Sequence, residues 1–230
     1  MNEGVKRLGT EESVPGDPSS IKAVIFDFGG VLCFHPTQDQ IARAAVACGM
    51  DAPKFLDTFW KLRPEYDRGA MGPEEYWSAF AKATGRKFDR EHIEEMVRRE
   101  IDFWSAYDER VLAWITQLRA QGYLTGILSN LPSPLGAHLR IRSWFLDHFD
   151  QVTFSYELLS AKPEAKIYRH VVKELGIAPE EALFLDDRRE NVEGAKAAGL
   201  QAVLYESWGS FLLRDLKKFG LPEPEGEARD

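Results

Sequence analysis

Apolar positions along this chain follow two different periodicities, and their order predicts the architecture. The run at 23–26 (AVIF) is continuously apolar and is followed by Asp27, Phe28 and two glycines, which is typical of a strand buried on both faces. The next comparable run lies at 123–128. The long segment between these two runs has the spacing of helices instead.

Helical signals fill this intervening segment. Pro73 suits the first turn of a helix that reaches about Ala83, and another helix is predicted from about Thr37 to just before Gly49. The clearest apolar stripe, with three- and four-residue spacing, consists of Ile93, Met96, Val97 and Ile101. Residues 36–107 are therefore predicted to form an all-helical insertion of about four short helices.

After residue 108, helical and strand patterns alternate. Such alternation predicts a parallel sheet with helices on both faces, because neighbouring parallel strands need a crossover connection. The predicted helices are about 109–120, 135–145, 164–175 and 191–198, and the strands are about 123–128, 152–154, 182–185 and 202–205. The fold class is thus α/β, with a Rossmann-like core at 21–35 and 108–220.

Composition narrows the class of protein. The chain has 230 residues, of which 44% are hydrophobic, with a formal net charge of -8 and two cysteines. The negative net charge argues against a nucleic-acid-binding protein. Two cysteines are too few for a disulfide framework and indicate a reducing compartment. No apolar run reaches the roughly 20 residues that span a bilayer. We predict a cytoplasmic protein with disordered polar tails at 1–20 and 221–230, whereas nothing in the sequence indicates its oligomeric state.

Polar side chains stand at the ends of three predicted strands. Asp27 follows the first strand, Ser129-Asn130 end the second, and Asp186-Asp187 follow the apolar run 183–185. Because ligands of open α/β sheets bind outside the carboxyl ends of the strands, these side chains are expected to converge at one edge.

Three converging carboxylates need positive charge nearby, since they raise one another's pKa values. An all-oxygen ligand set favours Mg²⁺, and Lys162, at a helix start, is a candidate for a second positive charge. Glu190 and Asn191 follow the acidic pair, where they either orient it or cap the next helix.

Four segments together resemble the motifs of the haloacid dehalogenase-like (HAD) hydrolase superfamily, in the same order. They are FDFGGVL at 26–32, LSN at 128–130, AKP at 161–163 and FLDD at 184–187. The resemblance extends over about 22–205, and the helical insertion resembles the C1-type cap of that family. The segments 162–168 and 191–195 resemble the subgroup that contains bacterial α-D-glucose-1-phosphate phosphatase, and the phosphatase domain of soluble epoxide hydrolase is also similar.

The resemblance implies a magnesium-dependent phosphatase that acts on a small phosphorylated metabolite, with sugar phosphates as the first candidates. Asp27 would form an aspartyl-phosphate, while Ser129, Asn130 and Lys162 would hold the phosphoryl oxygens. No nucleic-acid or membrane partner is expected.

The implied magnesium ligands are the carboxylates of Asp27 and Asp187 with the backbone carbonyl of Gly29. Asp186 would be a further ligand or a support for the others. Most phosphatases of the superfamily have a second aspartate at the position of Gly29, which protonates the leaving group. The loss of such an acid lowers the rate by roughly 10²–10⁴-fold unless another group replaces it.

Two alternatives remain open. A haloacid dehalogenase would share Asp27 as nucleophile, but its chemistry needs no metal and it typically lacks the paired acids. A catalytically idle binding or regulatory protein would keep the fold, and Gly29 is the feature that permits it. His35, Asp67 and Arg68 lie in or beside the insertion, and for them we predict solvated surface positions, not catalytic ones.

Overall fold

The computed structural model describes residues 21–225, and its centre is a five-stranded sheet in the order β3-β2-β1-β4-β5. All neighbouring strands are parallel. The strands are Ala23–Phe26 (β1), Leu124–Ser129 (β2), Gln151–Phe154 (β3), Ala182–Asp186 (β4) and Gln201–Leu204 (β5). The predicted α/β class and Rossmann-like parallel core are therefore confirmed.

The central strand β1 decides where a ligand can bind. All four of its residues are buried, as its unbroken apolar run predicts for a strand covered on both faces. The chain adds β2 and β3 on one side of β1, and β4 and β5 on the other. This reversal leaves a crevice at the carboxyl ends of β1 and β4, the usual ligand site of such sheets.

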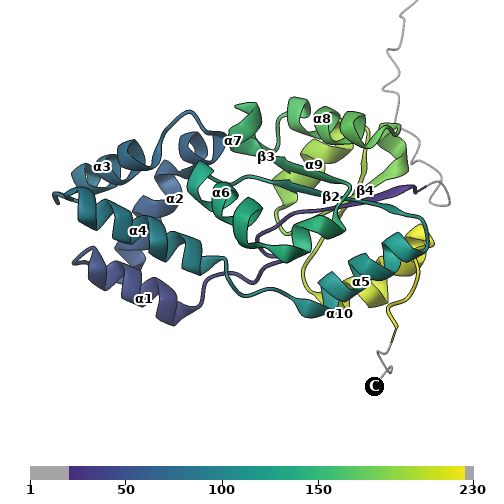
Figure 1. Cartoon of the computed structure of the whole chain (residues 1–230), viewed down its shortest axis with the longest axis horizontal. Coiled ribbons are helices and arrows are strands. Elements are labelled where there is room, and N and C mark those ends of the chain that lie inside the picture. Colours follow the sequence, from purple (N-terminus) through teal and green to yellow (C-terminus); the bar gives the residue numbers. More distant parts are fainter. Residues whose placement is uncertain (1–20, 226–230) are drawn as a thin grey trace, which may run out of the picture.

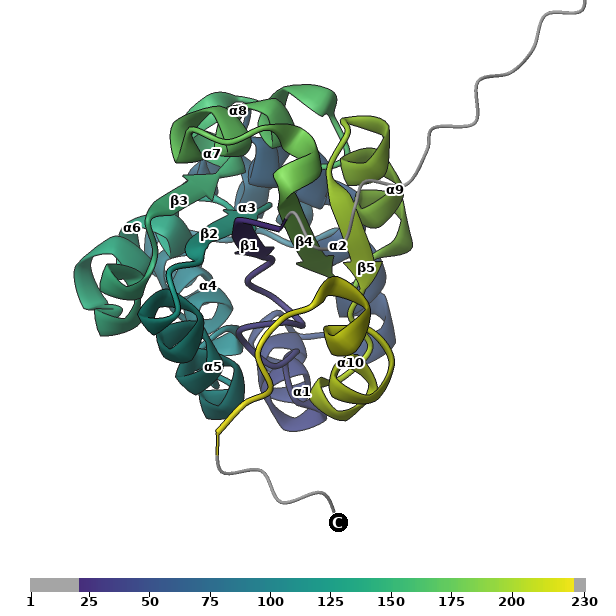
Figure 2. The same cartoon turned by 90° about the vertical axis from the view of Figure 1, so that its right-hand side faces the viewer.

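Helices cover both faces of the sheet (Figure 2). One face packs against α8 (Ala165–Leu175) and α9 (Arg189–Ala197), which bury Ile167, Val171 and Val192. The other face packs against α5 (Glu109–Ala120), α6 (Ser133–Arg142) and α10 (Trp208–Arg214).

Four helices lie between β1 and α5 and form the left half of the molecule in Figure 1. They are α1 (Gln38–Ala47), α2 (Ala52–Arg68), α3 (Pro73–Ala83) and α4 (Arg90–Phe103). Side chains of Thr37, Asp51 and Asp89 accept hydrogen bonds from backbone N–H groups of the first turns, which explains where three of these helices begin.

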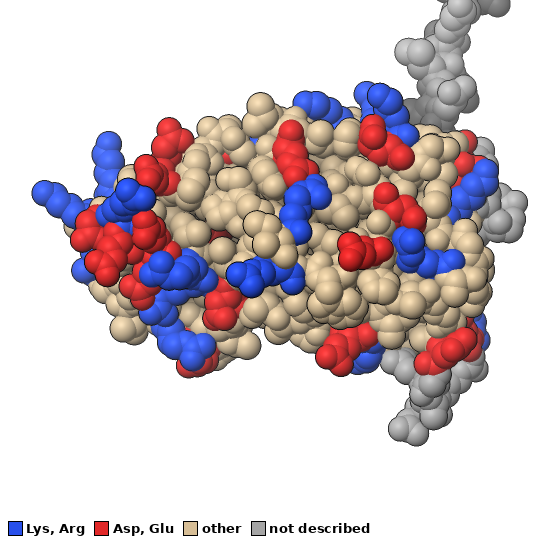
Figure 3. Space-filling model, in the orientation of Figure 1, with Lys and Arg blue, Asp and Glu red and all other residues tan. Residues whose placement is uncertain are grey.

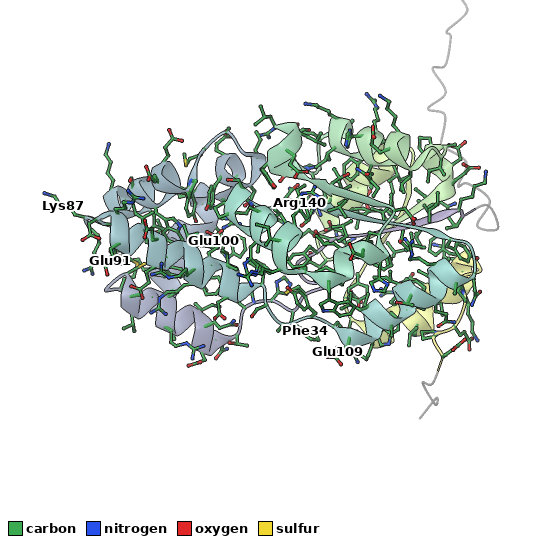
Figure 4. The ribbon with its side chains drawn as sticks, in the orientation of Figure 1. Phe34, Lys87, Glu91, Glu100, Glu109 and Arg140 are labelled. Carbon is green, nitrogen blue, oxygen red and sulfur yellow. The ribbon has the colours of Figure 1, made fainter. Side chains whose placement is uncertain are left out.

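The helical insertion and the sheet are joined by two segments that run side by side. Phe34 N donates to Ala106 O across 2.8 Å, and Asp108 N donates to Leu32 O across 2.9 Å. Figure 4 labels Phe34 at this junction. One continuous cluster of buried apolar side chains extends from the insertion to the sheet, so the two halves share a core.

Most predicted elements are present, and the differences lie toward the carboxyl end. The structure adds α7 (Ser155–Leu158), α10 and three 3₁₀ segments, Trp144–His148, Pro179–Glu181 and Leu216–Phe219. The prediction of a disordered tail was wrong for residues 221–225, because Trp114 Nε1 donates to Pro222 O and Glu225 N donates to Gln117 Oε1. Residues 1–20 and 226–230, the rest of the predicted tails, lie outside the described residues.

Acidic and basic side chains intermingle on the face shown in Figure 3. In the described part of the chain, no helix combines the length and apolar character of a membrane span.

Candidate active site

Asp27 lies directly after β1, in the crevice at the carboxyl edge of the sheet. Its N–H donates to Leu185 O of β4 across 2.8 Å, which fixes the residue between the two strands. The side chain faces a cavity of about 620 Å³. Burial raises the pKa of the Asp27 carboxyl to about 7, with a further rise from Asp186 and Asp187, although Lys162 acts in the opposite direction.

Lys162 supplies the positive charge beside Asp27. Its Nζ lies 2.8 Å from Asp27 Oδ1 and 2.7 Å from Asp186 Oδ2, and the residue is only 5% exposed. Burial lowers the pKa of the ammonium group, but Asp186 and Asp27 outweigh this effect and raise it overall. Lys162 therefore stays protonated and directs its charge at the Asp27 carboxylate.

Asp186 is fully buried, and both of its oxygens already have donors. Oδ1 accepts from Arg188 N and Asn191 Nδ2 at 2.8 and 3.0 Å, and Oδ2 accepts from Lys162 Nζ and Asn191 Nδ2 at 2.7 and 3.0 Å. Of the two roles left open by the sequence, this arrangement favours support of Lys162 over metal ligation. Glu190 instead pairs with Arg188 at the surface.

Asp187 is more open and lines the cavity. His35 Nε2 lies 3.0 Å from its Oδ2, and this contact raises the pKa of the imidazole. Gly30 makes the arrangement possible. It has a φ of 78°, and a Cβ there would lie 2.6 Å from Asp187 Oδ2 and 2.8 Å from His35 Nε2.

The residues present fit a divalent cation. One oxygen each of Asp27, Asp186 and Asp187 lies within 4.8 Å of the others, and Lys162 balances only part of their negative charge. Oxygen donors of this kind suit Mg²⁺. Gly29 lines the same cavity, beside the carboxylates of Asp27 and Asp187.

Ser129 and Asn130 are brought to the site as predicted, but the Asn130 amide is largely occupied. Its Nδ2 donates to Lys162 O at 2.9 Å, and its Oδ1 accepts from Lys162 N at 2.8 Å. The side chain thus holds the Lys162 backbone in place. Ser129, at the end of β2, lines the cavity.

Gly29 faces an aromatic ring from the insertion. A Cβ at Gly29 would lie 2.8 Å from Cζ3 of Trp104, the residue that follows α4. Real Cβ atoms do not approach a rigid, buried ring so closely, so a larger side chain at position 29 requires Trp104 to move. The glycine is therefore explained by packing between the insertion and the sheet.

The insertion provides one wall of the cavity. Its lining residues are Trp60, Arg63, Pro64, Asp67, Arg68 and Trp104. The prediction of solvated positions was wrong for Asp67, whose side chain is 15% exposed and lies beside Arg63, while Arg68 pairs with Glu164 of the core. Residues 60, 63, 64 and 67 have the spacing of one helical face, so the sequence alone could have grouped them on a single side of this helix.

A family model agrees with this arrangement. Residues 21–199 match the haloacid dehalogenase-like hydrolase family. The chain belongs to this family. The HAD-like hydrolase is similar to D-ribitol-5-phosphate phosphatase of Bacteroides thetaiotaomicron, at 28% identity over 79% of this chain and 90% of that protein.

Solved structures confirm the fold of this HAD-like hydrolase. It is similar to a HAD family enzyme of B. thetaiotaomicron in complex with magnesium, with a TM-score of 0.69, 23% identity, and coverage of 85% of this chain and 100% of that chain. L-2-haloacid dehalogenase of Xanthobacter autotrophicus also matches, with a TM-score of 0.61, 23% identity, and coverage of 86% and 83%. Because phosphatases and dehalogenases share the fold, the choice between their reactions depends on the site.

Proposed function

We propose that this hydrolase is a magnesium-dependent phosphatase acting on a small phosphate monoester through an aspartyl-phosphate on Asp27. One observation carries the proposal. A buried lysine lies between the carboxylates of Asp27 and Asp186, while Asp187 lies beside them at an open cavity. This combination suits a dianionic group that approaches a carboxylate nucleophile.

In this mechanism Asp27 Oδ attacks phosphorus, and water later hydrolyses the acyl phosphate. Lys162 would hold a phosphoryl oxygen, together with the Ser129 hydroxyl. Asn130 would act mainly by fixing Lys162. Asp27, Asp187 and the Gly29 carbonyl would hold Mg²⁺, with Asp186 as their support, and the ion would supply positive charge to the phosphoryl group.

The insertion is proposed to serve as a cap domain at 36–107, with 21–35 and 108–220 as the core domain. Its α2 wall covers the Asp27 site, so motion of the insertion would admit substrate and exclude water. The polar and aromatic wall formed by Trp60, Asp67 and Arg68 suits a small metabolite, and sugar phosphates are our first candidates.

The acidic pair favours a phosphatase over a dehalogenase. Displacement of a halide needs no metal, whereas Asp187 adds negative charge that a halocarboxylate substrate would not tolerate without a cation. A panel of phosphorylated metabolites, assayed with Mg²⁺ for phosphate release, tests the proposal. Chloride release from 2-chloropropionate without metal would favour the dehalogenase, and no turnover at all would favour an idle binding protein.

Magnesium is expected to stabilise the folded protein, and more so at pH 8 than at pH 6. Saturation to 100 times the Kd adds about 2.7 kcal/mol to the free energy of unfolding. Asp27, with its pKa near 7, is ionised at pH 8. At pH 6 its carboxyl group carries a proton that Mg²⁺ must displace, and this displacement weakens binding by about 1.4 kcal/mol for each pH unit below the pKa. Thermal unfolding with EDTA or Mg²⁺ at both pH values measures the effect.

Asp187→Asn serves as the matched variant for this measurement. It should lose most of the magnesium-dependent stabilisation, since one of the two proposed carboxylate ligands is gone. Equal stabilisation of the variant and the wild type would contradict the proposed ligand set.

A further inference from the structure

A buried charged cluster lies on the side of the insertion that faces the active site. Arg63 of α2 pairs through Nη1 with Glu100 of α4, and its Nη2 lies 2.6 Å from Asp67 Oδ1. Figure 4 labels Glu100 within the insertion. Two buried carboxyl groups thus share one guanidinium group, and the cluster is electrically balanced when one of them carries a proton.

We place the shared proton on Asp67, because Glu100 accepts more hydrogen bonds. Glu100 accepts a hydrogen bond from Arg63 and another from the Tyr66 hydroxyl at 3.3 Å. Among the described residues, no donor makes a well-directed hydrogen bond to the buried Oδ1 of Asp67, although Arg63 Nη2 lies 2.6 Å from it. Burial raises the pKa of Asp67 to about 6, against the effects of Arg63 and Arg188 and with a further rise from Glu100. Burial raises the pKa of Glu100 as well.

The end of α2 is held against the core beside the nucleophile. The Ser155 hydroxyl donates to the backbone oxygen of Asp67, and Ser155 Oγ accepts from the N–H of Leu131, the residue directly after Asn130. Arg68 pairs with Glu164, two residues after Lys162. Asp67 and Asp27 line the same cavity, so Asp67 borders the space in which the leaving group of an ester bound at Asp27 must lie.

Position 29, where most phosphatases of the family have their general acid, cannot hold a larger side chain in this structure. The ring of Trp104 fills the space that the side chain of an aspartate at position 29 would need. The leaving oxygen must therefore obtain its proton from another group that lines the cavity. Asp67 is a carboxylic acid, is positioned by the core, and is part of a cluster that stabilises its charge once the proton has left.

We infer that Asp67 is the general acid of this hydrolase, an assignment that rests on the proposed phosphatase function. As Asp27 Oδ bonds to phosphorus, the bond from phosphorus to the ester oxygen breaks, and that oxygen takes the Asp67 proton. The alcohol leaves, and Asp67 remains as a carboxylate beside Arg63. In the second step water attacks phosphorus, its proton returns to Asp67, and Asp27 and inorganic phosphate are released.

The dependence of rate on the leaving group tests the inference. Asp67→Asn is compared with wild type on p-nitrophenyl phosphate, whose phenolate leaves without a proton, and on the best alkyl phosphate of the metabolite panel. The ratio of kcat/KM for the alkyl to the aryl ester is expected to fall by roughly 10²–10⁴-fold. Because both esters are measured on one preparation, the ratio does not depend on how much of the variant is folded.

Asp57→Asn, an exposed position on the same helix, is the control and should leave the ratio unchanged. Equal losses on the two esters in Asp67→Asn would overturn the inference while leaving the phosphatase intact. The inference is also overturned if His35→Gln lowers the ratio and Asp67→Asn does not, since the acid would then be His35. A wild type that hydrolyses no ester would overturn the phosphatase proposal and this inference with it.

Discussion

Replacement of Asp27 by asparagine is expected to lower kcat by a factor on the order of 10⁴ or more, because an amide cannot form the acyl phosphate. The change keeps the size of the side chain, and its neighbours Lys162 and Asp186 still pair with each other at 2.7 Å. Single-turnover assays with Mg²⁺ would show the loss. Mass spectrometry of acid-quenched protein should detect a phosphoryl adduct on the wild type and none on Asp27→Asn.

The same variant separates loss of chemistry from loss of folding. The raised pKa of Asp27 means that its ionised form destabilises the fold, so stability is lost as pH rises from about 4 through about 7. In EDTA at pH 8, Asp27→Asn should therefore unfold at a higher temperature than the wild type. Turnover retained at the wild-type rate would disprove the role of Asp27 as nucleophile.

Lys162→Met is expected to reduce both activity and stability. Without the Lys162 ammonium group, Asp27 and Asp186 become buried carboxylates with no counter-charge. In the absence of Mg²⁺ this change lowers the free energy of unfolding by about 3–5 kcal/mol. Loss of its contact with the phosphoryl group should lower kcat by roughly 10²–10³-fold. Denaturant unfolding in EDTA and steady-state kinetics measure the two effects.

The pH dependence of this destabilisation identifies its cause. Burial raises the pKa of Asp27 to about 7, so its protonation at lower pH removes the repulsion from Asp186, and the difference from wild type should shrink at pH 5 and grow at pH 8. Lys173→Met, an exposed lysine on α8, is the matched control and should change neither property. A destabilisation that is independent of pH would indicate a packing defect instead.

The sheet and the motif residues were predictable because both depend on local patterns. A continuous apolar run marks a buried strand, and parallel connectivity brings the strand ends at Asp27, Ser129 and Asp186 to one edge. The sequence therefore predicted that these side chains converge, without information on any distance. It could not distinguish a metal ligand from a support, because that depends on hydrogen bonds such as those from Asn191 to Asp186.

The contribution of the insertion could not be predicted in this way. Arg63 and Asp67 are charged, and charged residues on a helix usually face solvent, so their burial becomes visible only when α2 is packed against α4 and the core. The C-terminal segment shows a similar limit. It is polar, yet residues 222 and 225 hydrogen-bond with α5.

The paired connecting segments at Phe34 and Ala106 have a consequence for protein engineering. Because the chain leaves the sheet and returns to it at neighbouring points, the helices between them can be exchanged for those of a relative without a change in sheet connectivity. A chimera made at these two positions must still match the pair formed by Gly29 and Trp104. A donor segment with a small residue in place of the tryptophan would leave room for an aspartate at position 29.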